Sequence, residues 1–401
     1  MALNWHTNCF WNVFIAIHFF RSIHMKKTSS IALSLFAISN IQHTYAALSQ
    51  MKSIHFINIQ LIEAIKNDQY FEAHRYLLLG ANPTEIVHGT SAFHEAIKLG
   101  NETIFRMILF SVEKYQVKGR LDKHQRYPLE LAVELKNPKF VSSLLNYYQN
   151  NSFQQHLLKI SKTLLENKKE SDLSFLVACG YPLKLKNKFK ESIVHLSLKY
   201  GFEDLFFFLF QKNINLSDEN MYYENIPFLL IKHSHFSLMK ELIFLGVDIN
   251  IVNSKDISPL FYAVNEENEK AVEVLLSKGL KIKNESNEGL GSPLHAAIKN
   301  GNQKLFKMLI TKINPLIVNQ DLNTPLHLIA WLGDIDIATI FFSFLKDNNK
   351  NGIDLKNGDG DTPLHLAVLN GDEEMFKILY KNGADITIKN KDEYDPIDLA
   401  R

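Results

Sequence analysis

The sequence predicts an all-α fold in which short helix pairs stack on one another along the chain. Its 401 residues, 46% hydrophobic and 22% charged, have the composition of a folded protein but exceed what one compact core usually holds. Similar segments recur about every 33 residues, and each contains two apolar stretches with helical periodicity. Units of this size cannot bury their apolar faces alone, so stacking on neighbours must stabilise them.

The repeat is clearest in three nearly identical segments. These are Ser292-Pro-Leu-His-Ala-Ala-Ile298, Thr324-Pro-Leu-His-Leu-Ile-Ala330 and Thr362-Pro-Leu-His-Leu-Ala-Val368. Each precedes a glycine (Gly301, Gly333 and Gly371) and then a second apolar helical stretch. This pattern resembles the ankyrin repeat, which has a Thr-Pro-Leu-His signature and a length near 33 residues. The resemblance implies a solenoid of helix-turn-helix units joined by short hairpin-like loops, called fingers below.

The register of the repeat can be followed through most of the chain. Positions equivalent to the signature proline are Gln60, Ala92, Pro128, Ile160, Ile193, Pro227, Pro259, Pro293, Pro325, Pro363 and Pro396, at spacings of 32 to 38 residues. The motif is strong from Ser258 onward and weak before Ser192. The ankyrin-repeat array is therefore expected to span residues 54–401, as about ten units and a truncated eleventh. The two longest spacings predict insertions near residues 111–120 and 346–353, which we expect to lengthen loops.

Individual residues of the repeat have physical reasons to recur. The Thr362 hydroxyl is expected to cap the first helix by accepting a backbone N–H, and Pro363 suits the first helical turn. Gly371 allows a tight turn between the helices, and Gly383 allows a left-handed cap after the second. The last unit, from Asp395, lacks a complete polar capping helix, so we expect this end to fray.

Residues 25–46 have the pattern of a bacterial-type secretory signal peptide. A positive start (Met25-Lys-Lys27) precedes an apolar stretch at 31–38 and the small-x-small site Thr44-Tyr-Ala46. Cleavage after Ala46 predicts a mature chain that begins at Ala47 and is exported to the periplasm or secreted. Residues 1–24 are then interpreted as a misassigned extension.

A membrane anchor is the alternative interpretation of this region. Residues 10–20 and 31–41 are both apolar, but each run is about half of the roughly 20 residues that a spanning helix needs. Basic and titratable residues between them make spanning unfavourable. We therefore expect no stable membrane insertion of the mature chain.

Composition and motifs argue against several classes of function. Lys and Arg number 44 against 43 Asp and Glu, so no basic excess favours nucleic acid. Cys9 and Cys179 are too few for a disulfide framework, and no Cys-x-x-Cys pair indicates zinc; Cys179 is interpreted as a small core residue. Phosphate-binding loops, a nucleophile elbow and His-Glu-x-x-His do not occur. We expect no enzymatic activity, cofactor or metal.

Histidines recur at the fourth place of the signature, as His94, His195, His295, His327 and His365. Repetition at one register position indicates an architectural role, and the ankyrin resemblance implies hydrogen bonds to a neighbouring repeat. His233 and His235 do not share a helical face and have no carboxylate close by in sequence, so we interpret them as a solvated or partner-contacting pair. The segment Asn357-Gly-Asp-Gly-Asp361 lacks the glutamate of a calcium loop and is interpreted as a finger turn.

The resemblance also implies where a partner binds, on a concave side made of finger tips and first-helix ends. On the fingers this selects Lys188, Phe189, Tyr222, Tyr223, Lys255, Ile257, Gln320 and Asp321, and on the helix ends Lys199, Tyr200, His233 and Trp331. Aromatic residues concentrate binding energy at interfaces. The alternative for Phe189, Tyr222 and Tyr223 is packing on irregular neighbouring loops. Trp331 lies in a regular motif, so we expect it to face outward and its loss to leave stability nearly unchanged.

These observations predict a monomeric scaffold that binds a protein partner, without nucleic acid. The ankyrin resemblance implies a secreted bacterial effector acting on a host or envelope protein. Two alternatives stay open: the ankyrin portion of a truncated enzyme or toxin, and a membrane-anchored scaffold.

Overall fold

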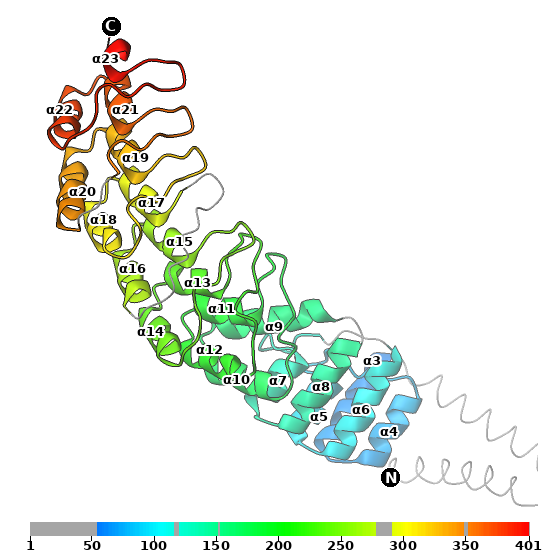
Figure 1. Cartoon of the computed structure of the whole chain (residues 1–401). Coiled ribbons are helices and arrows are strands. Elements are labelled where there is room, and N and C mark those ends of the chain that lie inside the picture. The colour runs from blue at the N-terminus through cyan, green and yellow to red at the C-terminus, as the bar shows by residue number, and fades with distance from the viewer. Residues whose placement is uncertain (1–53, 116–119, 151–152, 278–290, 349–351, 401) are drawn as a thin grey trace, which may run out of the picture. The chain divides into compact units, whose positions relative to one another are not determined.

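The computed structural model describes residues 54–115, 120–150, 153–277, 291–348 and 352–400 (Figure 1). The predicted extension at 1–24 and the predicted signal peptide at 25–46 lie outside these residues. Within the described part of the chain there are 21 helices and no strands. The predicted all-α fold of stacked helix pairs is confirmed.

The helices alternate between first and second members of pairs. The first helices are α3 (Ile54–Lys66), α5 (Ala92–Leu99), α7 (Pro128–Glu134), α9 (Gln154–Glu166), α11 (Ile193–Lys199), α13 (Ile226–Lys232), α15 (Pro259–Asn265), α17 (Pro293–Lys299), α19 (Pro325–Leu332) and α21 (Pro363–Leu369). The second helices are α4 (Tyr70–Leu78), α6 (Glu102–Tyr115), α8 (Pro138–Asn150), α10 (Glu170–Ala178), α12 (Glu203–Phe210), α14 (Phe236–Phe244), α16 (Glu269–Leu276), α18 (Gln303–Ile310), α20 (Ile335–Asp347) and α22 (Glu373–Lys381). The short helix α23 (Pro396–Leu399) follows α22.

Contacts divide the described chain into two compact units, one of residues 54–160 with 178–180 and one of residues 161–177 with 181–400. In the first unit, α5 packs between α3 and α7, and α6 packs between α4 and α8. In the second unit, first helices from α11 to α23 pack in sequence order, as do second helices from α14 to α20. Each unit therefore has a layer of first helices and a layer of second helices.

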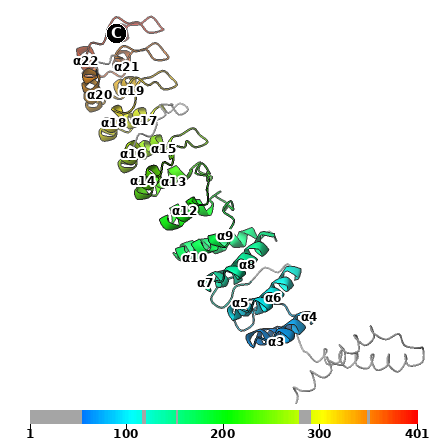
Figure 2. The same ribbon diagram turned by 60° about the horizontal axis from the view of Figure 1, so that its bottom comes forward.

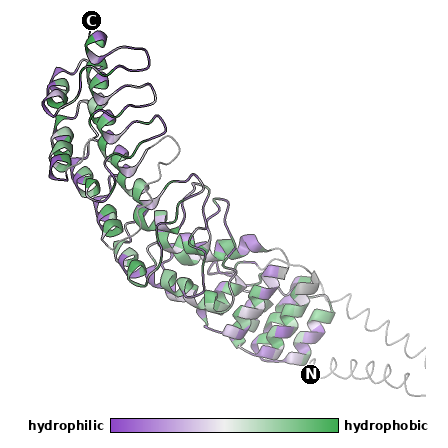
Figure 3. Ribbon diagram, viewed as in Figure 1, coloured by the Kyte–Doolittle hydropathy of each residue, from purple (hydrophilic) through white to green (hydrophobic). Residues whose placement is uncertain are grey.

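In the second unit, the fingers extend from the first-helix layer on the side away from the second helices (Figures 1 and 2). Hydrophobic residues concentrate on the helices, whereas the fingers are mostly hydrophilic (Figure 3). The apolar residues that the repeat directs inward form the core: Leu364 and Ala367 on α21 and Met375 and Leu379 on α22 are fully buried.

The two weakest repeats differ from the others at their first helices. Helix α3 begins at Ile54 and α9 at Gln154, although the register placed their signature positions at Gln60 and Ile160. No proline or capping residue of the signature stops the helix at those positions, so it extends further toward the N-terminus. In the repeat of α13, Asn225 is the capping residue, and Pro227 therefore occupies the second helical position.

The expectation that insertions lengthen loops is wrong. Helix α6 has 14 residues and α20 has 13, whereas second helices such as α16 and α18 have 8. The helices extend into the inserted segments, as far as Tyr115 and Asp347, because buried residues such as Val112 and Leu345 continue their apolar periodicity and neither helix contains a glycine or proline.

The five signature histidines connect successive repeats. In each, Nε2 lies 3.0–3.1 Å from a backbone carbonyl oxygen of the following finger, those of Arg126, Asp218, Asn323, Asp361 and Tyr394. At His195, His295, His327 and His365, a backbone N–H at the helix start donates to Nδ1 over 3.1–3.2 Å. Nδ1 is therefore the acceptor in a neutral ring, and Nε2–H donates to the carbonyl. The architectural role predicted for these histidines is confirmed.

The capping residue beside the histidine bridge has further roles in two repeats. The Thr362 side chain takes part in a capping box at the start of α21, and its hydroxyl also lies 2.8 Å from Nδ1 of His365. The repeat of α13 has no signature histidine, and Asn225 replaces it. Its Nδ2 donates to the carbonyls of Ile251 and Val252 in the next finger, each over 3.2 Å, while its Oδ1 accepts from the Phe228 amide.

The histidine bridges should make the stack sensitive to acid. Burial lowers the pKa of His94, His195 and His295 below 6.5 and lowers the pKa of His327 to about 4. Between pH 6.5 and 4 the unfolded chain binds a proton at His327 that the native chain does not, so stability falls as the pH falls through this window. From pH 6.5 to 5 this ring alone should lower the free energy of unfolding by about 2 kcal/mol.

Urea unfolding of the wild type and His327→Gln at pH 7.5 and pH 5.0 measures this contribution. The variant will be less stable at pH 7.5 because it loses the bridge, but we expect its further loss at pH 5.0 to be about 2 kcal/mol smaller than that of the wild type. Equal losses in both proteins would contradict the neutral-ring assignment.

Candidate interaction surface

One side chain fixes the shape of each of seven described fingers. The residues are Asp122, Asn187, Asn220, Asn253, Asn319, Asn357 and Asn390, and each Oδ1 accepts backbone N–H groups from two and four positions later over 2.8–3.1 Å. The sequence analysis missed these residues, although each lies five positions before a helix cap. Asn357 belongs to this set, so the finger turn predicted at 357–361 is confirmed.

We call these seven asparagine and aspartate side chains the frame residues. The three residues that follow each frame residue form the tip of its finger. The third tip residue has a positive φ, for example 58° at Lys190, 63° at Tyr223 and 57° at Asp256. Frame residues are alike between fingers, but tip residues differ. The tips therefore give each repeat its surface chemistry on a common backbone.

The tips of three successive fingers carry aromatic rings and lysines. We call Lys188, Phe189, Tyr222, Tyr223 and Lys255 the aromatic–lysine patch. Nζ of Lys188 lies 4.9 Å from the centroid of the Phe189 ring, and Nζ of Lys255 lies 3.9 Å from that of Tyr223. Tyr222 and Tyr223 are 56% and 44% exposed, whereas Phe189 is half-buried. The alternative that these rings are packed away on neighbouring loops therefore does not hold for the two tyrosines.

First-helix ends adjoin the fingers through a repeated ion pair. Lys199 at the end of α11 pairs with Glu191 at the finger base over 2.9 Å, and Lys232 pairs in the same way with Glu224. Nζ of Lys232 also lies 5.9 Å from the ring centroid of Tyr222. Finger tips and helix ends thus form one surface in this part of the second unit.

Most predicted surface residues are exposed. Lys188, Lys199, Tyr200, Tyr222, Tyr223, Lys255, Gln320, Asp321 and Trp331 are exposed, whereas Phe189, His233 and Ile257 are half-buried. The structure brings the aromatic–lysine patch and Lys199 together. Gln320, Asp321 and Trp331 belong instead to the repeat of α19, three repeats beyond that of α13. Trp331 is 50% exposed at the position that Lys199 and Lys232 occupy in their repeats.

The interpretation of His233 and His235 as a solvated pair is wrong for His235. This ring is buried, its Nδ1 lies 2.6 Å from Oε1 of Glu203, and its Nε2 lies 2.7 Å from the carbonyl oxygen of Leu198. It therefore joins the start of α14 to the preceding repeat. His233 is half-buried, and burial lowers its pKa.

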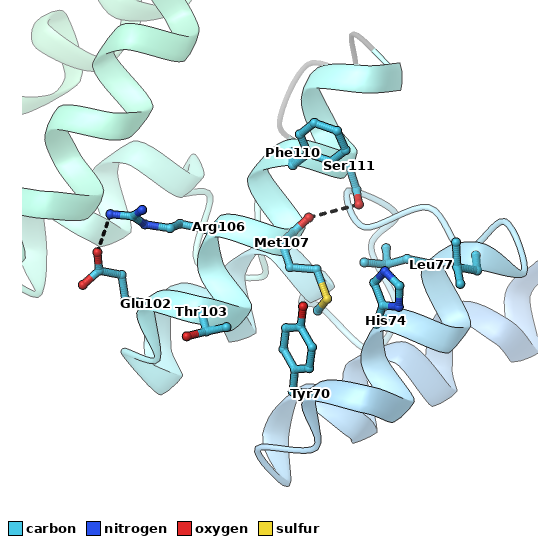
Figure 4. Close-up of a pocket in the computed structure, with 10 residues that line it drawn as sticks. Tyr70, His74, Leu77, Glu102, Thr103, Arg106, Met107, Phe110 and Ser111 are labelled. Atoms are coloured by element: carbon cyan, nitrogen blue, oxygen red, sulfur yellow. Dashed lines mark hydrogen bonds and ion pairs between the residues drawn. The ribbon is translucent and has the colours of Figure 1, made fainter. Parts of the chain in front are cut away.

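A hollow of about 670 Å³ lies between α4 and α6 in the first unit (Figure 4). Tyr70 and His74 line it from α4, and Met107 lines it from α6. Leu78 and Phe110 at its edge are 73% and 70% exposed. Its acidic group, Glu102, is paired with Arg106 over 2.6 Å, so the hollow offers mainly apolar contact.

Cys179 is the one cysteine among the described residues. Burial raises the pKa of the half-buried Cys179 thiol, which disfavours the reactive thiolate. Among the described residues, His, Cys, Asp and Glu form no cluster of three that could hold a metal ion. No described helix has the length and apolar character needed to cross a membrane.

Comparison with known proteins identifies the repeats. A family model of ankyrin repeats in three copies matches residues 228–319 and 312–390, from α13 through the finger after α22. Residues 228–390 consist of ankyrin repeats. The ankyrin register extends beyond the matched residues, because the frame residues and histidine bridges recur at Asn187 and His195 in the same geometry.

Several known proteins match parts of the chain. The human transient receptor potential cation channel subfamily A member 1 is 29% identical over 169 residues, 41% of this chain and 15% of the channel. A putative ankyrin repeat protein of fowlpox virus is 30% identical over 152 residues, 37% of this chain and 44% of the viral protein. One of Rickettsia bellii is 48% identical over 61 residues, 14% of this chain and 36% of the bacterial protein. The chain spans less than half the length of each relative.

The exposure of Trp331 generates a stability prediction. Trp331→Ala should lower the free energy of unfolding by at most about 1 kcal/mol, because half of the ring already contacts solvent. Phe341→Ala, which empties a fully buried site on α20 of the same repeat, should lower it by about 3–5 kcal/mol. Urea unfolding of the two variants beside wild type checks both values; similar losses would show that Trp331 is part of the core.

Proposed function

We propose that this ankyrin-repeat chain is a scaffold that binds a protein partner through its finger tips and first-helix ends. Ankyrin repeats generally mediate protein–protein interaction. The observation that carries the proposal is the contrast between a uniform hydrogen-bonded frame and exposed aromatic tips, Tyr222 and Tyr223 above all. Large exposed rings held on a fixed backbone lose little conformational entropy on binding and are common interface anchors.

We further propose that the chain acts after export, as an effector on a host or envelope protein. The support is the signal-peptide pattern of residues 25–46. Ankyrin-repeat proteins typically serve as non-catalytic scaffolds, and this supports binding in preference to the truncated-enzyme alternative. We propose a monomer, because each repeat is already covered by its neighbours in the chain.

Site-specific photocrosslinking tests the binding surface. A benzophenone amino acid at Tyr222 or Trp331 of the full chain should form adducts with a partner protein in cells that produce or receive the chain. The same residue at Tyr380 on the second helix α22, which is 56% exposed, is the matched control and should form few adducts. Adducts that are absent at both test positions, or equally frequent at Tyr380, would refute this surface.

Mass spectrometry of the chain produced with residues 1–46 intact tests export. We expect the secreted or periplasmic form to begin at Ala47, because cleavage after Ala46 follows the small-x-small site. A chain that retains Met1 in the membrane fraction would instead support the membrane-anchored alternative, and retention of Met25 in the exported fraction would contradict cleavage.

A further inference from the structure

We propose that the aromatic–lysine patch binds an acidic, extended peptide segment of the partner protein. The inference rests on the proposed scaffold function and adds to it a location and a partner chemistry.

The patch is continuous across three fingers. At the first boundary, the Met221 amide donates to the carbonyl of Phe189 over 2.9 Å. At the second, Nδ2 of Asn253 donates to the carbonyl of Tyr223 over 3.0 Å. These bonds hold the tips against one another, so the rings and lysines present a single surface that crosses three repeats.

The charges at these fingers are unevenly compensated. Carboxylates at the finger bases have partners within the chain: Glu191 with Lys199, Glu224 with Lys232, and Asp218 with Lys186. Glu219 accepts hydrogen bonds from the amide and hydroxyl of Ser254.

The tip lysines, in contrast, have no carboxylate partner among the described residues. Lys188, Lys190 and Lys255 are exposed and form no ion pair with another described side chain, and Asp256 is the one tip carboxylate of these fingers without such a pair. Three lysines against Asp256 and against Glu219, whose carboxylate is bonded to Ser254 of a tip, leave the tips with an excess of one positive charge. The surface therefore favours a partner with negative charge.

The rings determine what else the partner needs. Lys188 and Lys255 lie over ring faces, where cation–π attraction positions them without neutralising their charge. Carboxylates of a peptide can pair with these lysines while its apolar side chains cover the exposed rings. An extended peptide can contact the three tips in turn, because its side chains are spread along its length.

Nucleic acid fits this surface less well. Single-stranded nucleic acid needs a continuous cationic groove along its phosphates. Here the carboxylates of Glu191 and Glu224 lie at the finger bases, and Asp256 lies beside Lys255. An acidic peptide can place its charges opposite separate lysines, and a regular phosphate backbone cannot.

Selection of displayed random peptides of about 12 residues on the immobilised full chain tests the proposal. The selected peptides should have net negative charge with interspersed apolar or aromatic residues. Their affinity should fall at least about tenfold for Lys188→Glu/Lys255→Glu and should weaken as salt is raised. The matched control is Lys240→Glu/Lys270→Glu, which makes the same charge change on exposed lysines of α14 and α16 and should bind as wild type does.

Several outcomes would overturn the proposal. These are selected peptides of neutral or basic composition, no enriched peptides, equal losses in the control variant, or competition by oligo-dT. Circular dichroism of both double variants checks that a loss is not caused by unfolding. If photocrosslinked partners survive Lys188→Glu/Lys255→Glu unchanged, the scaffold function stands and this site is wrong; if no partner is captured at all, the scaffold function itself fails.

Discussion

The structure depends on a hydrogen bond between repeats, from the buried Nε2–H of a signature histidine to a carbonyl of the following finger. Helices satisfy their own backbone groups, but finger backbones form no strands in the described residues and must find other partners. The histidine supplies one of them, and the finger asparagine supplies two more from within its own loop. Because the ring receives a hydrogen bond at Nδ1, its tautomer is fixed and it donates in one direction only. In the five repeats that carry the histidine, the following finger is thereby attached to the first helix of that repeat.

This attachment separates stability from surface chemistry. The signature histidines and the frame residues form the hydrogen bonds that hold the fingers, and the side chains of the tip residues take no part in these bonds. A tip can therefore change from lysine and phenylalanine at Lys188 and Phe189 to glutamine and aspartate at Gln320 and Asp321 without altering the backbone bonds. In the repeat of α13, which lacks the histidine, Asn225 makes the corresponding connection, since it both caps α13 and donates to the next finger. A hydrogen bond from the first helix to a carbonyl of the next finger is thus kept, although the side chain that donates it differs.

The sequence predicted the fold well where local signals decide local structure. Proline, capping residue and histidine together determine where α17, α19 and α21 begin, and the structure has these starts. The prediction was weaker where those signals are missing. Helices α3 and α9 extend past their register positions, and the inserted residues from Ser111 and from Lys346 continue helices that were expected to end. Without a glycine or proline, apolar periodicity alone favours continuation of the helix.

The surface was only partly predictable because its contacts join residues about one repeat apart. His235 was expected to be solvated since no carboxylate lies near it in sequence, but Glu203 of the preceding repeat supplies one. Ion pairs between neighbouring fingers also decide the net charge of a finger. Asp218 by itself would make its finger acidic, but Lys186 of the previous finger pairs with it. Which charges remain available to a partner is therefore decided by ion pairs between repeats. At Lys188 and Lys255, whose ammonium groups lie over aromatic rings and form no ion pair with a described carboxylate, the positive charge remains available to a partner.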